Sequence, residues 1–113
     1  MKSNNGIISF ENKKEAEILL NESRKRIDEI DNVLFELISE RTALANDIVC
    51  SKQYLEMPIY DENREKAVHD KIRSWAEEND LDVDIIDQIV DMLTILSKNE
   101  QEKILRRNVN GQY

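Results

Sequence analysis

The sequence predicts an all-α fold, and two observations carry this prediction. Only two of the 113 residues are glycine, Gly6 and Gly111, both near the ends of the chain, and Pro58 is the only proline. Apolar residues recur every three or four positions, which is the period of amphipathic helices. Because β sandwiches, barrels and βαβ folds need turns at short intervals, the scarcity of turn-forming residues excludes them.

The composition limits the class of protein. Charged residues make up 35% and hydrophobic residues 40% of the chain, which is typical of a soluble, folded protein. The net charge of −8 argues against a general nucleic-acid binder, which needs a dense basic face. No apolar run approaches the ~20 residues that span a bilayer, no signal-peptide core opens the chain, and the single Cys50 cannot form an internal disulfide. We therefore expect a cytoplasmic protein.

The length of the chain is enough for one domain. Residues 1–10 and 108–113 contain Asn and Gly and show no helical period, so we predict flexible tails on either side of a domain at residues 11–107. The first helix of this domain is predicted over about residues 11–54, which contain no glycine or proline.

This first helix is too long to be buried by its own chain. On a wheel of 100° per residue, an apolar stripe lies within about 60° of Arg41. It consists of Ile27, Ile30, Leu34, Leu37, Leu44 and Ile48. A helix of forty-odd residues is roughly 60–65 Å long, whereas a compact domain of this size is only about 30–35 Å across. The stripe therefore needs a second chain, and we expect a homodimer.

Two further helices complete the prediction of a long, a short and a medium helix. Pro58 ends the first helix, and Asp61 stands where the N-cap of the next would lie. That short helix covers about residues 61–78. A turn at residues 79–80 separates it from a third helix, which extends to about Arg106.

Polar side chains interrupt the apolar faces of all three helices. Arg41 lies in the centre of the first stripe, and Lys52 follows about 20° away on the wheel and ~16 Å along the axis. On the third helix, Ser97 and Gln101 form an i,i+4 pair. The first turn of the second helix contributes Asp61, Arg64 and Glu65. Each is by itself more often a snorkelling side chain, an incidental pair or a cap. Because buried unpaired cations are costly, together they predict an anion-binding site.

Arg24 needs a different explanation. It precedes Arg41 by seventeen residues, which places it ~25 Å away and about 100° around a straight helix. It therefore cannot serve the same small site within one chain. It can serve the equivalent site of a partner chain, so that each site of a dimer takes one arginine from the other subunit.

Together these residues resemble the all-helical (type II) class of chorismate mutases. The pattern consists of an Arg at the start of the long helix, a second Arg seventeen residues later, a Lys eleven further on, D-x-x-R-E at the short helix and S-x-x-x-Q in the last. All eight positions match, at Arg24, Arg41, Lys52, Asp61, Arg64, Glu65, Ser97 and Gln101. The resemblance covers about residues 20–105. It implies an intertwined all-α homodimer with two sites and conversion of chorismate to prephenate, on the route to phenylalanine and tyrosine.

The resemblance also implies a role for each residue, with no cofactor or metal. Three arginines would grip the two carboxylates of the substrate with help from a serine, and Arg24 would come from the partner chain. The residues of this grip are Arg24, Arg41, Arg64 and Ser97. Lys52 and Gln101 would donate hydrogen bonds to the ether oxygen as its bond breaks. Glu65 and the backbone near Asp61 would bind the ring hydroxyl.

Other functions remain open from the sequence. Relatives on the same fold act on amino-deoxychorismate or eliminate pyruvate from isochorismate, and a non-catalytic helical dimerisation module is a third possibility. His69, the single histidine, lies on the short helix beside charged neighbours, so we expect it at the solvated surface. One histidine makes no metal site.

Overall fold

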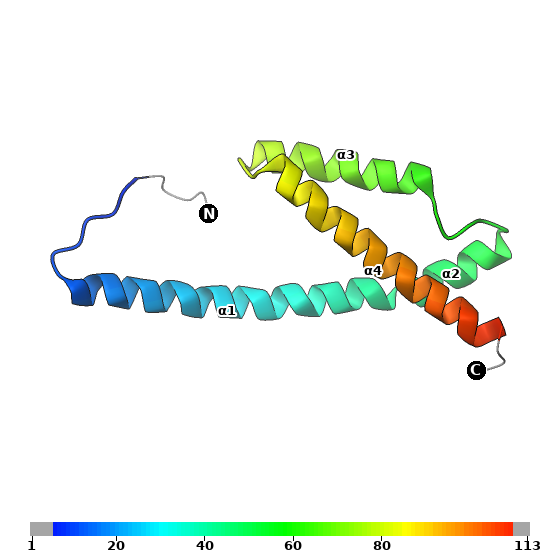
Figure 1. Cartoon of the computed structure of the whole chain (residues 1–113), viewed down its shortest axis with the longest axis horizontal. Coiled ribbons are helices and arrows are strands. Elements are labelled where there is room, and N and C mark those ends of the chain that lie inside the picture. Colours follow the sequence, from blue (N-terminus) through cyan, green and yellow to red (C-terminus); the bar gives the residue numbers. More distant parts are fainter. Residues whose placement is uncertain (1–5, 110–113) are drawn as a thin grey trace. The chain divides into compact units, whose positions relative to one another are not determined.

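The computed structural model describes residues 6–109, and within them it contains four helices and no strand (Figure 1). The helices are α1 (Lys13–Ala43), α2 (Ala45–Tyr54), α3 (Glu62–Glu78) and α4 (Val83–Val109). The all-helical prediction is confirmed. Of the two predicted tails, residues 1–5 and 110–113 lie outside the described residues. No helix in the described part is long and apolar enough to cross a membrane.

The long helix expected over residues 11–54 is present as α1 and α2, with the single residue Leu44 between them. Leu44 keeps right-handed helical dihedral angles, φ −67° and ψ −12°. Its N–H donates to the carbonyl of Arg41 at 3.3 Å, an i→i−3 bond that tightens the helix locally, and its carbonyl accepts from the N–H of Ile48 at 3.0 Å. The helix is therefore interrupted at one residue and not ended there.

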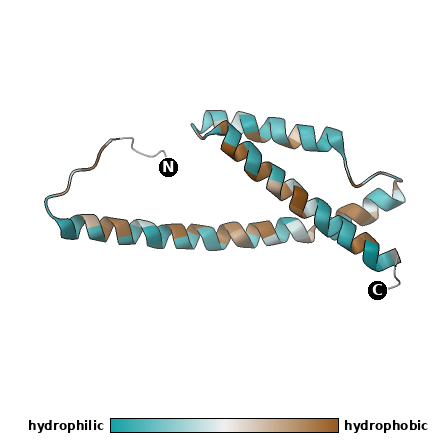
Figure 2. Cartoon of the chain, in the orientation of Figure 1, coloured by the Kyte–Doolittle hydropathy of each residue, from teal (hydrophilic) through white to brown (hydrophobic). Residues whose placement is uncertain are grey.

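The chain divides into two units, residues 1–36 and 37–113. Hydrophobic and hydrophilic residues intersperse along α1, whose first part forms the helix of the first unit (Figure 2), and α1 contains no buried residue. Large apolar side chains of this unit are exposed, among them Ile18, Leu20, Ile27, Ile30, Val33, Leu34 and Phe35. Because exposed apolar surface of this extent favours association, the unit presents a helix face suited to another protein surface.

In the second unit, α2 and α3 each pack against α4. The buried apolar side chains are small: Ala45 and Val49 on α2, Ala76 on α3 and Val90 on α4. Small side chains at a helix contact let the two backbones approach closely. These contacts place the end of α2 and the start of α3 beside α4. Most of the predicted site residues lie on these three segments.

Two helices end without a glycine in this unit. After α2, Glu56 has φ 55°, its N–H donates to the carbonyl of Gln53 at 3.1 Å, and the N–H of Met57 donates to that of Lys52 at 2.8 Å. This is the Schellman pattern, in which a residue usually filled by glycine adopts the left-handed region. After α3, Asp80 has φ 54° and the N–H of Leu81 donates to the carbonyl of Ala76 at 2.9 Å. Both chain reversals therefore occur at non-glycine residues, close to the breaks predicted at Pro58 and at residues 79–80.

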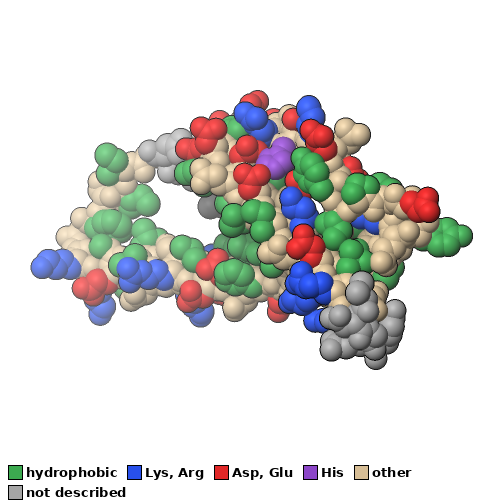
Figure 3. Space-filling model, turned by 45° about the vertical axis from the view of Figure 1, so that its right-hand side comes forward, with side chains coloured by type: hydrophobic (Ala, Val, Ile, Leu, Met, Phe, Trp, Pro, Cys, Tyr) green, Lys and Arg blue, Asp and Glu red, His purple; other side chains and the backbone are tan. Residues whose placement is uncertain are grey.

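His69 joins α3 to α4, and it is less exposed to solvent than expected. Its side chain is 21% exposed, and its Nδ1 and Nε2 lie 2.6 Å and 3.0 Å from carboxylate oxygens of Asp87 and Asp91 on α4. Figure 3 shows the histidine among acidic side chains. The hydrogen bond to Asp87 raises the pKa of His69 above its ordinary value of 6.5 against the opposing effect of burial, and the charges of Asp87, Asp91 and Glu65 add to the increase.

This histidine predicts a pH dependence of stability. Because the pKa of His69 is raised on folding, the stabilisation is complete below its unfolded value near 6.5 and is lost as the pH rises through the raised folded value. We expect the free energy of unfolding, measured in urea, to decrease between pH 5.5 and pH 8.5. His69→Gln should remove most of this slope, and equal slopes for the two proteins would contradict the assignment.

Candidate active site

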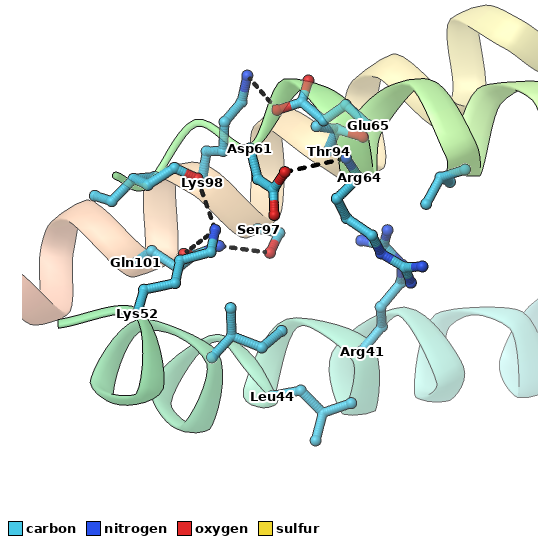
Figure 4. A pocket seen from close by; sticks show the side chains of 13 residues that line it. Arg41, Leu44, Lys52, Asp61, Arg64, Glu65, Thr94, Ser97, Lys98 and Gln101 are labelled. Atoms are coloured by element: carbon cyan, nitrogen blue, oxygen red, sulfur yellow. Dashed lines mark hydrogen bonds and ion pairs between the residues drawn. The ribbon is translucent and has the colours of Figure 1, made fainter. Parts of the chain in front are cut away.

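A pocket of about 450 Å³ lies in the second unit (Figure 4). That volume is within the usual range for small-molecule sites. Its walls come from the end of α1, from α2, from the loop before α3, from the first turns of α3 and from α4. Polar side chains line it at Arg41, Lys52, Asp61, Arg64, Glu65, Thr94, Ser97, Lys98 and Gln101, and apolar ones at Leu44, Ile48, Ile59 and Val68.

Seven of the eight predicted site residues line this one pocket, and Arg24 does not. Arg24 is exposed and belongs to the first unit of the chain, so its role in a partner's site stays a prediction. Sequence reasoning missed Thr94 and Lys98. The signal for them was present, since they share one face of α4 with Ser97 and Gln101 at helical spacing.

A chain of hydrogen bonds joins α2 to α4 at the base of the pocket. Lys52 Nζ donates to the carbonyl of Ile59 at 2.7 Å and to Gln101 Oε1 at 3.1 Å, and Gln101 Nε2 lies 3.3 Å from Ser97 Oγ. Gln101 is only 3% exposed. Because an ammonium group only donates, Gln101 must turn its oxygen to Lys52, and its NH₂ group then faces Ser97. Two of the three Lys52 donors have partners among the described residues, which leaves one for a ligand.

The local sequence explains why Lys52 reaches the loop. Lys52 lies in the last turn of α2, and the left-handed residue Glu56 reverses the chain directly after that helix. Pro58, which cannot continue a helix, follows the reversal. The chain returns past the end of α2, so the carbonyl of Ile59 lies within hydrogen-bond distance of Lys52.

The start of α3 is fixed by its N-cap, as predicted. Asp61 is extended, with φ −113° and ψ 90°, and its carboxylate accepts from the backbone N–H of Arg64 at 3.1 Å. The backbone carbonyl of Asp61 accepts from the N–H of Glu65 at 3.0 Å. The cap thus brings one cation and two carboxylates into the first turn beside the pocket (Figure 4).

Arg41 and Arg64 line the pocket, but both are exposed in the single chain. Arg41 Nη1 donates to the carbonyl of Leu93 on α4 at 3.1 Å. The burial expected for Arg41 is not found here, because the apolar stripe around it is also exposed, including Leu37, Leu44 and Ile48. These stripe residues are therefore uncovered within the described part of their own unit.

The pocket is positive although the whole chain is acidic. Its charged lining residues are four cations and two carboxylates, Arg41, Lys52, Arg64, Lys98, Asp61 and Glu65, which leaves an excess of two positive charges. The net charge of the full sequence is −8. Because cationic hydrogen-bond donors bind carboxylates strongly, the pocket suits a small dianion with an apolar body.

Comparison with known proteins identifies the family. The sequence profile of chorismate mutase type II matches residues 23–102, which contain all eight predicted site residues. The chain belongs to this family. A chorismate mutase from Methanocaldococcus jannaschii is 41% identical over 91 residues, which are 80% of this chain and 92% of that protein.

Two more distant relatives of this type II chain are larger proteins. They are bifunctional chorismate mutase/prephenate dehydratases from Buchnera aphidicola and Enterobacter agglomerans, 27% and 28% identical over 97% and 77% of this chain. The matched parts are 25% and 22% of their lengths. The family match begins at residue 23, whereas α1 begins at Lys13, so the first turns of α1 precede the matched domain.

Proposed function

We propose that this type II family member is a chorismate mutase, which rearranges chorismate to prephenate in the synthesis of phenylalanine and tyrosine. The observation that carries the proposal is the joined Lys52–Gln101 pair, 3.1 Å apart, in a pocket with an excess of two positive charges. The substrate is a dianion with an ether bond, so both its charge and its reacting oxygen have a complementary group here. A cytoplasmic location is part of the proposal, and the single cysteine supports it.

The reaction breaks one C–O bond and forms one C–C bond within a single molecule, without proton transfer. A protein can accelerate it by holding the folded conformer and by stabilising negative charge on the ether oxygen. In the proposal, Arg41, Arg64 and Ser97 grip the carboxylates, whereas Lys52 and Gln101 donate to the ether oxygen. Glu65 and the backbone near Asp61 receive the ring hydroxyl. A rate gain of 10⁶ needs only ~8 kcal/mol, which a few preorganised donors can supply.

The proposal includes a homodimer in which Arg24 of each chain completes the pocket of the other. Support comes from the apolar side chains of α1, such as Ile27, Ile30 and Leu34, which are exposed on the single chain. Covering them with a second copy would remove a large apolar area from water. It would also bury the stripe that surrounds Arg41.

The test of the function is the purified protein mixed with chorismate. We expect loss of the diene absorbance and accumulation of prephenate as the product, identified by NMR spectroscopy because the two isomers have the same mass. Isochorismate and amino-deoxychorismate are assayed in parallel. Release of pyruvate from isochorismate, or turnover restricted to amino-deoxychorismate, would replace the proposal with an alternative activity of the same fold. A folded protein that binds no dicarboxylate would indicate a dimerisation module.

A further inference from the structure

Lys98 forms an ion pair unlike the other Lys and Arg pairs of the described chain. Its Nζ lies 3.4 Å from Glu65 Oε2, and the pair joins α4 to the first turn of α3. The side chains of Lys98 and Glu65 are only 29% and 24% exposed. The other such pairs among residues 6–109 are i,i+3 or i,i+4 neighbours on one helix, and each has a partner at least half exposed, namely Arg26–Glu29, Lys66–Asp70 and Lys103–Glu100.

A second contact holds the same ammonium group. Lys98 Nζ lies 5.1 Å from the centroid of the Tyr60 ring, within the range of a cation–π interaction. Tyr60 belongs to the loop before α3, next to Ile59, whose carbonyl accepts from Lys52. Lys98 therefore contacts both the loop and the helix start that form one wall of the pocket, and two anchors restrict an otherwise flexible side chain.

We propose that Lys98 is a positioning residue, which holds the Glu65 carboxylate in place as the acceptor for the ring hydroxyl of the substrate. The inference rests on the proposed function. A carboxylate has two oxygens and about four acceptor positions, so contact with Lys98 through Oε2 leaves Oε1 available to a ligand. Lys98 also offsets the negative charge of Glu65, which would otherwise repel a dianion in the same pocket.

The position of the hydroxyl determines which kinetic constant changes. The ring hydroxyl takes no part in the bonds that break and form, so its contact with Glu65 is equally strong in the ground state and the transition state. Loss of such uniform binding raises KM and leaves kcat unchanged. A purely structural role for Lys98 would have the opposite signature, because a smaller folded fraction lowers the apparent kcat at constant KM.

The experiment measures KM and kcat for chorismate in matched variants. Lys98→Met removes the charge at similar length, and we expect roughly a tenfold increase in KM with kcat within about twofold of the wild type. Lys98→Arg keeps the charge and should return KM to within about threefold. The control is Lys103→Met, the same change on α4 at a residue that is 52% exposed, pairs with Glu100 and does not line the pocket. It should leave both constants unchanged.

A double variant tests whether Lys98 acts through Glu65. If it does, adding Lys98→Met to Glu65→Gln should raise KM no more than about twofold beyond Glu65→Gln alone. Additive effects would overturn the inference, as would an unchanged KM in Lys98→Met, and neither result would affect the proposed function while the wild type produces prephenate. Absence of turnover by the wild type would overturn both.

Discussion

Lys52→Ala is expected to lower kcat for chorismate by about a thousandfold, with a smaller change in KM. Lys52 Nζ donates hydrogen bonds to two acceptors, the carbonyl of Ile59 and Gln101 Oε1, and its third N–H is available to the ether oxygen. The negative charge on that oxygen develops as the bond breaks, so the lost interaction belongs mainly to the transition state. The alanine variant also frees the Gln101 amide from the partner that fixes its orientation. Steady-state kinetics by diene absorbance measure both constants.

The matched control is Lys66→Ala on α3. Lys66 pairs with Asp70 at 2.8 Å on the exposed face of its helix and does not line the pocket. Exposed pairs of this kind contribute little, so activity should not change. Far-UV circular dichroism should be the same for both variants and the wild type. If Lys52→Ala keeps its kcat within tenfold of the wild type, Lys52 is not the donor to the ether oxygen.

Gln101→Glu is expected to convert a pH-independent enzyme into one that is active only in acid. The Gln101 amide donates at any pH, and its oxygen already faces Lys52. A glutamate at this position can donate only in its protonated form, whose fraction falls about tenfold per pH unit above the pKa of the group. We expect kcat of the variant to fall by at least about a hundredfold between pH 5 and pH 8.

The wild type measured at the same two pH values is the control for general acid effects, and its kcat should change little. Gln101→Leu, which keeps the approximate size and removes both polar atoms, should have low activity at both values. Equal activity of Gln101→Glu at pH 5 and pH 8 would refute the assigned role.

The helices themselves were predictable from the sequence, because apolar spacing, the cap at Asp61 and the absence of internal glycine are local properties. The details of the helix ends were not. Leu44 interrupts the long helix with helical dihedral angles, and no residue type at that position signals the change. Glu56 and Asp80 adopt the left-handed conformation that is usually taken by glycine.

Much of the pocket was predictable for the same reason. Positions on one helix face stay together in the fold, so spacing placed Ser97 with Gln101 and Arg41 with Lys52. The contacts between helices were not predicted. Lys98 looks like a surface lysine until the packing of α3 on α4 brings Glu65 within 3.4 Å, and the partners of His69 lie on another helix. The proposed role of Arg24 involves a second chain, so it is not among the contacts of one chain.

Mixing two inactive variants tests the central claim of a cationic pocket completed across two chains. Arg24→Ala and Lys52→Ala are each expected to be inactive as homodimers. In the mixed dimer one site carries both defects, and the other combines an intact Arg24 with an intact Lys52. Unfolding and refolding an equimolar mixture should therefore restore about a quarter of the wild-type rate, since half of the dimers are mixed and half of their sites are intact. No recovery, although mixed dimers are present by native mass spectrometry, would contradict the account.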